Sequence, residues 1–283
     1  MTRHLLVLAF LAAPLPAFAA GGTTAPTQPA SKLHVAMTVY AGGITMGKVN
    51  MDATLRGGEY QVVSNLQTSG IVNAFWQAEI QASSSGRVTD KTFAPALYDS
   101  FNTRQATGKR QQVSLSYEDE NPPRLYADPP YSTSGFEVKP LDAKGTLDPL
   151  SALTLIASGV AAKDGNPCAV NLPVFDGRRR YNVDLAKVRD IDIKMDNGLY
   201  QGKAVQCEIR YRPVAGFRQR LLNNNDSFPV IRAWVARFPS AIAGRDYTVP
   251  LRVWAETKYG VIAVLATALK VDGQSPKGVR SGS

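Results

Sequence analysis

The chain has 283 residues, a formal net charge of +9, 44% hydrophobic residues and two cysteines. This length suits one large domain or two small ones, because domains average roughly 100–200 residues. Two cysteines and His34 are too few soft ligands for a metal site, and no Gly-rich nucleotide-binding loop occurs, so we predict no metal and no cofactor.

The first residues of the chain predict export. A short positive start at Arg3 and His4 precedes an apolar run over residues 5–13, and an A-x-A cleavage motif ends at Ala19. The apolar run is too short for a permanent membrane anchor, which needs about 20 residues. We therefore expect residues 1–19 to be a cleaved signal peptide and the mature protein to act in the periplasm.

The positive charge points to an anionic counterpart. Nucleic acid is not expected as the partner of an exported protein, so lipid headgroups, lipopolysaccharide phosphate and acidic glycans are the candidates. An equally open interpretation is that the charge reflects only solubility or a basic proteome. No stretch after the leader is apolar and long enough to predict a transmembrane segment in the mature chain.

Residues 20–32 are rich in Gly, Thr, Pro and Ala and are expected to form a disordered leader, after which alternating apolar residues predict strands. Glycine turns at residues 41–43 and 56–58 join the first three strands, which is typical of an antiparallel meander. The expected strands of this half are residues 33–40, 44–55, 59–68, 76–84, 96–105 and 110–117. Two proline pairs within residues 121–130 then predict a loop, because proline cannot donate a ladder hydrogen bond.

One segment predicts a helix. Asp148 can accept the free amide protons of a first turn as the N-cap, and Pro149 suits the first helical position. Apolar residues then cover most of the circumference over Pro149–Ser158, and Gly159 is a natural end. We expect sheet to cover this helix on more than one side.

Strands return after the helix, at residues 168–176, 181–188, 191–194, 203–212, 230–238, 250–258 and 261–269. The pattern as a whole predicts a mostly β fold, in which a curled antiparallel sheet, an incomplete barrel or β-spiral, wraps around one central apolar helix. A single β-rich domain should extend over residues 33–271, followed by a flexible tail at residues 272–283.

Cys168 and Cys207 both lie in the exported part of the chain. In an oxidising compartment a disulfide between them is the leading interpretation. It would close a loop of about 39 residues and stabilise the fold by about 3–4 kcal/mol. Two separate buried thiols are the alternative.

The run from Asp176 to Arg180 is the most pointed candidate site. If it continues as a strand, Arg178 and Arg180 share a face and can bind a phosphate or carboxylate through bidentate guanidinium contacts. The alternative is structural, with an arginine that pairs with Asp148 or Asp184 and locks the helix to the sheet. For the arginines both interpretations stay open.

Arg210 and Arg212 share a face of a later expected strand and form a second candidate anion site, with a solvated strand face as the alternative. Trp76, Trp234 and Trp254 are expected in the core, although an unclosed sheet can expose such side chains in an apolar groove.

The sequence offers no catalytic set. After the leader His34 is the one histidine, and no G-x-S-x-G motif occurs, so a hydrolase of the Ser-His-Asp kind is not expected. We expect no enzyme activity. The alternative is a pair of carboxylates that cleaves glycan, because the sequence leaves their separation in space open.

Two motifs carry a resemblance to a known family: Asp148-Pro149-Leu150-Ser151-Ala152, and Phe175-Asp176-Gly177-Arg178-Arg179-Arg180-Tyr181. With the YAGG sequence at Tyr40 and the closing Trp254…Tyr259-Gly260, they resemble the bacterial domain-of-unknown-function family 3108 over roughly residues 33–269. The resemblance implies an exported envelope protein with a curled antiparallel sheet around a helix, loosely similar to the half-barrels of periplasmic lipoprotein carriers. It implies no established reaction, so no catalytic residue is transferred.

We therefore expect a non-enzymatic periplasmic binding or scaffold protein that supports the cell envelope. A lipid, lipopolysaccharide or envelope protein would lie in an apolar groove whose basic rim consists of Arg178, Arg180, Arg210 and Arg212. Structural roles are assigned to Asp148, Pro149, Asp176 and Gly177. A metal-independent hydrolase of envelope glycan is the alternative, and a structural module without a small ligand is the third hypothesis.

Overall fold

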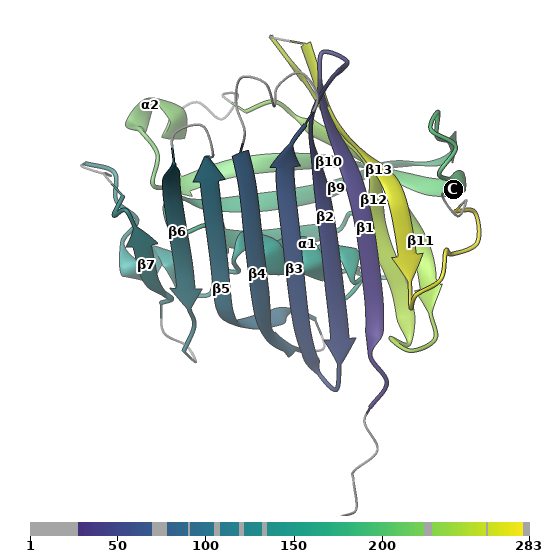
Figure 1. The fold of residues 1–283 in the computed structure, drawn as a ribbon, viewed down its shortest axis with the longest axis horizontal. Helices are drawn as coiled ribbons and strands as arrows, with labels where there is room; N and C mark the ends of the chain where they lie inside the picture. Colours follow the sequence, from purple (N-terminus) through teal and green to yellow (C-terminus); the bar gives the residue numbers. More distant parts are fainter. Residues whose placement is uncertain are drawn as a thin grey trace, which may run out of the picture.

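The computed structural model describes residues 28–69, 78–89, 91–104, 108–118, 122–131, 135–223, 228–258 and 260–279 (Figure 1). The expected signal peptide, Trp76 and most of the expected leader lie outside these residues. The expected domain boundaries therefore stay predictions.

The described strands form one sheet in the order β7-β6-β5-β4-β3-β2-β1-β13-β12-β11-β10-β9-β8, and every neighbouring pair is antiparallel. Two meanders, β1 to β7 and β8 to β13, meet where β1 pairs with β13. The strands are β1 (Ser31–Ala41), β2 (Ile44–Arg56), β3 (Glu59–Thr68), β4 (Ala78–Val88), β5 (Phe93–Arg104), β6 (Lys109–Ser116), β7 (Arg124–Asp128), β8 (Val170–Phe175), β9 (Arg180–Lys194), β10 (Gln201–Ala215), β11 (Ile231–Ser240), β12 (Arg245–Thr257) and β13 (Gly260–Val271). This confirms the prediction of a mostly β protein built on an antiparallel sheet.

The alternation of side chains along the strands gives the sheet one buried and one exposed face. On β1 Leu33 and Val35 are buried, and on β2 Met51 and Ala53 are buried between exposed polar neighbours. We call the buried side the inner face and the other side the outer face. A strand slipped by one residue would exchange the two faces, so the apolar pattern determines the register.

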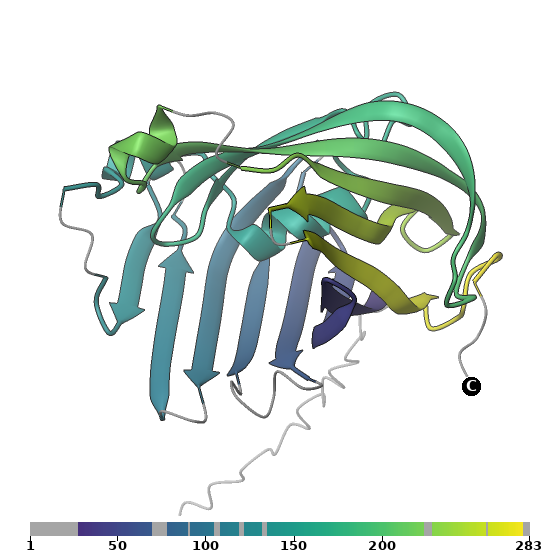
Figure 2. The same ribbon diagram turned by 90° about the horizontal axis from the view of Figure 1, so that it is seen from above.

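The sheet curls without closing. In the view of Figure 2, β9 and β10 arch over the strands of the first meander, and β7 and β8 are the two ends of the sheet. Within the described residues β7 pairs only with β6, and the free edge of β8 accepts one parallel bridge, from Leu147 to Val174. The sheet is therefore open and does not close into a barrel.

The helix α1 (Pro149–Ala157) lies between the two meanders and contacts β3, β4, β5, β8 and β12 (Figures 1 and 2). Asp148 is its N-cap and Pro149 occupies its first turn. Leu150, Leu155 and Ala157 are buried. The other described helices are short: the 3₁₀ helix η3 (Pro140–Ala143) and α2 (Gln219–Leu222).

The predicted disulfide is present. Cys168 and Cys207 are bonded with Cα atoms 5.6 Å apart, and both are fully buried. The bond joins the segment after α1 to β10 and so links the helix to the second meander.

Two sequence predictions about strands are wrong in detail. The proline-rich stretch contains β7, which the proline pairs only flank; proline is tolerated next to an edge strand because its missing N–H faces no partner. The two strands expected at residues 181–188 and 191–194 are the single long β9.

Candidate binding sites

The turn between β8 and β9 lies against the far end of the first meander. Oδ1 of Asp176 accepts hydrogen bonds from the backbone N–H groups of Arg178 (2.9 Å) and Arg179 (2.7 Å). Gly177 has φ +88°, and a Cβ placed on it would lie 2.7 Å from Cγ1 of Val113 and 3.0 Å from Cδ1 of Leu125. A side chain at this position would press on β6 and β7. We call this place, where the two ends of the sheet approach each other, the seam.

The seam holds a polar pocket of about 240 Å³ between the inner face of β5 and β6 and the turn. Tyr98, Asn102 and Arg178 are among its lining residues. Nε of Arg178 and Oδ1 of Asn102 are buried and have no hydrogen-bond partner among the described residues. Buried polar atoms of this kind are rare in native proteins, because an unmade hydrogen bond costs about 1–3 kcal/mol. The pair therefore offers a donor and an acceptor to an occupant of the pocket.

A second, more apolar pocket of about 470 Å³ continues the seam outward. Leu125 and Tyr126 of β7 and Phe175 of β8 line it, and Tyr131 and Arg178 line both pockets. The guanidinium of Arg178 lies 5.6 Å from the ring centroid of Tyr131, a cation–π contact that holds the arginine in place. We call the two pockets together the seam groove.

Tyr98 and Tyr131 keep their hydroxyl protons at neutral pH and can donate hydrogen bonds. Burial raises the pKa of Tyr98 to about 12, and burial also raises the pKa of Tyr131. The groove thus combines hydroxyl and guanidinium donors and the carboxylate of Asp176 at one end with mainly apolar walls, and Glu137, at the other.

Arg180 does not line the seam groove with Arg178. It is the first residue of β9, whereas Arg178 lies in the turn, so strand alternation does not relate the two. Nε of Arg180 donates to the carbonyl of Asp142 (3.2 Å) and its Nη1 to Oδ1 of Asn182 (2.7 Å). Arg180 therefore ties β9 to the 3₁₀ helix η3.

Arg210 and Arg212 lie on the exposed side of β10, opposite Cys207 and Tyr211. Nη2 of Arg210 is 2.7 Å from Oε1 of Glu208, and Arg212 pairs with Asp184. Of the four arginines expected at one rim, the structure places one, Arg178, in the seam groove. The other three have partners elsewhere.

Asp148 is the centre of a buried hydrogen-bond network between α1 and the sheet. Its Oδ1 accepts from the backbone N–H groups of Leu150 (3.0 Å) and Ser151 (2.8 Å), and its Oδ2 accepts from the hydroxyls of Ser84 (3.0 Å) and Ser151. The hydroxyls of Tyr60 and Ser151 are 2.5 Å apart. All four polar side chains are at most 3% exposed, so the network lies in the interior and fixes α1 on β3 and β4.

Sequence analysis missed Ser84 and Tyr60 as members of this network. Tyr60 and Ser151 are 91 positions apart in the sequence, and their contact depends on the curl of the sheet. The alternation of β3 does predict that Tyr60 is buried, but nothing in the sequence names its partner.

The model of the family described as "Protein of unknown function (DUF3108)" matches residues 36–267. The chain belongs to this family. The match confirms the resemblance carried by the Asp148 and Asp176 motifs. No curated protein matches this DUF3108 chain.

A solved structure supports the fold of this DUF3108 protein. It is the "beta-barrel-like protein of domain of unknown function DUF1849 from Brucella abortus", at 11% sequence identity with a TM-score of 0.50. The alignment covers 87% of the DUF3108 chain and 98% of the neighbour. At this identity the likeness shows the barrel-like architecture alone.

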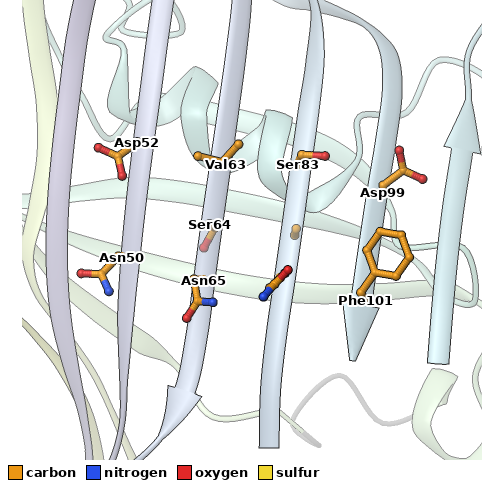
Figure 3. Close-up of a pocket in the computed structure, with 10 residues that line it drawn as sticks. Asn50, Asp52, Val63, Ser64, Asn65, Ser83, Asp99 and Phe101 are labelled. Atoms are coloured by element: carbon orange, nitrogen blue, oxygen red, sulfur yellow. The ribbon is translucent and has the colours of Figure 1, made fainter. Parts of the chain in front are cut away.

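A further pocket of the DUF3108 protein lies on the outer face of the first meander, away from the seam. Its volume is about 340 Å³, and its floor is β2 to β5 (Figure 3). Asp52, Asn65, Asp99 and Phe101 are among the residues around it. No part of this site was predicted from the sequence, because it forms only when four strands align their exposed side chains.

Trp234 and Trp254 are half-buried, pack edge-to-face on each other and both contact an arginine. Their ring centroids are 5.5 Å apart, and the guanidinium of Arg252 lies 4.9 Å from the first and 5.1 Å from the second. They do not line the seam groove. The described residues contain no group of three or more His, Cys, Asp or Glu able to hold a metal ion, and none of their helices is long and apolar enough to cross a membrane.

Proposed function

We propose that this DUF3108 protein is an exported, periplasmic, non-enzymatic binding protein of the cell envelope. Its ligand is an amphiphile with an anionic head group, such as a lipid, held in the seam groove. The leader with its A-x-A motif supports export, and the net charge of +9 favours an anionic ligand. α1 acts as the central element around which the sheet winds, so the interior is filled and the ligand site lies at the seam.

The observation that carries the proposal is the buried, unpaired Nε of Arg178. A phosphate or carboxylate oxygen in the polar pocket would accept from this donor, and a charge-assisted bond of this kind is about twice as strong as a neutral one. The apolar pocket beside Leu125 and Phe175 then receives the hydrocarbon part. Asn102 can accept from a hydroxyl or an amide of the same head group.

The carboxylates of the α1 network and of the outer pocket are unsuited to glycan hydrolysis, which favours binding at these places. Asp148 is fully buried. Asp52 and Asp99 are accessible but lie on β2 and β5, three strands apart, a separation of about 14 Å at the usual strand spacing. A glycosidase pair requires about 5–10 Å.

The test is a titration of the purified protein with decyl phosphate and with decanol, below their aggregation concentrations. Substitution of Arg178→Ala should weaken decyl phosphate binding about tenfold or more, because it removes a hydrogen bond to a charged group. Decanol binding should change little.

The matched control is Arg210→Ala, which removes an equal charge from the exposed side of β10. It should leave both affinities unchanged. An equal loss of decyl phosphate affinity in the two variants would mean that only the net charge of the protein matters. Unchanged decyl phosphate binding in Arg178→Ala would refute the assignment of the head-group site.

A further inference from the structure

The pocket on the outer face of β2 to β5 is built from two rows of side chains that cross the strands (Figure 3). Strand register aligns Asp52, Val63, Ser83 and Asp99 in the first row. It aligns Asn50, Asn65, Gln81 and Phe101 in the second. The rows are two residues apart along each strand, about 7 Å, and each row covers about 14 Å across four strands.

The polar groups of the rows are held in place before any ligand arrives. Oε1 of Glu79 accepts from Nδ2 of Asn65 (2.7 Å) and from Nε2 of Gln81 (2.9 Å). These bonds, with one from Gln67, lower the pKa of Glu79, so it stays a carboxylate. The two amides are thereby oriented, and their floor consists of strands paired on both sides. A rigid, ordered surface loses little conformational entropy on binding.

The electrostatic character of the pocket differs from that of the whole chain. Its described lining residues include two carboxylates and no Lys or Arg, although the net charge of the protein is +9. One oxygen of Asp52 is bonded to Nδ1 of His34 (2.8 Å), and one oxygen of Asp99 accepts from Ser114. The second carboxylate oxygen of each remains a candidate acceptor. The surface therefore suits a ligand rich in hydroxyl or ammonium donors and disfavours an anion.

The pocket also has an apolar component. Phe101 and Val63 are both 46% exposed; Phe101 ends the second row on β5, and Val63 lies between Asp52 and Ser83 in the first row (Figure 3). A sugar ring has an apolar C–H face and a hydroxyl edge, so it can lie on the phenyl ring of Phe101 while its edge contacts Gln81 and Asp99. An aliphatic chain would take water from the second carboxylate oxygens of Asp52 and Asp99 and offer them no donor, which costs free energy.

We propose that this outer face is a second binding site, for a glycan chain of amino sugars laid across β2 to β5. Phe101 is the stacking platform, and Asp52 and Asp99 accept from hydroxyl or ammonium groups of the chain. The site shares no residue with the seam groove, and the proposal stands independently of the anionic ligand.

The experiment is a calorimetric titration of the full mature protein with tetramers of β-1,4-linked glucosamine and of N-acetylglucosamine. Both tetramers should bind, and the glucosamine tetramer more tightly because it carries ammonium groups. Phe101→Ala should weaken both about tenfold. Asp99→Asn should weaken only the glucosamine tetramer, by about threefold to fivefold, as expected for an exposed charge pair.

The matched control is Leu97→Ala. Leu97 lies on the same strand and the same face, is 45% exposed, and does not line the pocket. Its substitution should leave both affinities within twofold, and thermal unfolding of each variant checks that the fold is intact. Absence of binding at millimolar tetramer, or equal losses in Phe101→Ala and Leu97→Ala, would overturn the glycan site. An unchanged glucosamine affinity in Asp99→Asn would overturn the role of the carboxylate.

Discussion

The carboxylate of Asp148 joins the N-terminus of α1 to β4 and accepts four hydrogen bonds, which explains why an acid can be fully buried in this protein. Burial raises its pKa above the ordinary value of 3.8, and the hydrogen bonds from Ser151, Ser84 and Leu150 only partly oppose this. A carboxyl whose folded pKa is raised favours the folded state below its unfolded pKa. That contribution is lost as the pH rises through the folded pKa.

The pH dependence of stability tests this assignment. Asp148→Asn keeps an acceptor at the N-cap but removes the titration. We expect the free energy of unfolding of the wild type, relative to the variant, to be greatest near pH 3.5, to fall as the pH rises above about 4, and then to level off. Denaturant titrations from pH 3.5 to 8 measure it.

Asp142→Asn serves as the control, because Asp142 is an exposed carboxyl outside the network. The difference in the free energy of unfolding between the wild type and Asp142→Asn should not show the fall above about pH 4 that is expected for Asp148→Asn. If the free energy of unfolding of the wild type, relative to Asp148→Asn, rose with pH, the raised pKa of Asp148 would be contradicted.

At the scale of elements, α1 is attached to both meanders by its ends. Its N-terminus is bonded to β3 and β4 through Asp148 and Ser151. At its C-terminus the hydroxyl of Thr248, on β12, donates to the carbonyl of Ile156. Gly159 follows with φ +72°, and a Cβ there would lie 2.1 Å from the carbonyl oxygen of Asp246.

Gly159→Ala is therefore expected to destabilise the fold more than a positive φ alone requires. Gly145 is the control, with φ +69° and nothing within 4 Å of an added Cβ. Gly145→Ala should cost about 1–2 kcal/mol, and Gly159→Ala at least about 1 kcal/mol more, because β12 must move. Equal changes in the denaturation midpoints would show that α1 does not press on β12.

The sequence predicted the elements better than their contacts. Alternation and glycine turns gave β1 to β3 closely, and Asp148-Pro149 located the start of α1, because these signals are local. β7 was missed because the flanking prolines argue against a central strand and say nothing about an edge. The sequence singled out Arg178 as an anion-binding candidate, because a guanidinium binds phosphate or carboxylate and a turn precedes it. Its neighbours Asn102 and Tyr131 depend on the curl of the sheet, which no local pattern encodes.

At the scale of the whole molecule, the sheet is open, yet its two ends approach at the seam. Gly177, in the β8–β9 turn, lies so close to β6 and β7 that an added Cβ would be 2.7 Å from Val113 and 3.0 Å from Leu125. These contacts join the most distant strands of the sheet order, β6 and β7 with β8 and β9. The seam is thus the place where the curl can loosen without the loss of a strand pair.

Gly177→Ala tests whether the seam holds the curled shape. The control is Gly135→Ala, since Gly135 has φ +87° against +88° for Gly177 but nothing within 4 Å of an added Cβ among the described residues. Both variants carry the same backbone strain, whereas only Gly177→Ala overpacks the seam, at a further cost of about 1 kcal/mol or more. Hydrogen exchange should become faster in β6 and β7 of Gly177→Ala while β1 and β13 stay protected, because the end of the sheet loosens before its middle. If exchange became faster in all strands, or did not become faster in β7, contacts between the two ends of the sheet would not stabilise the curled shape.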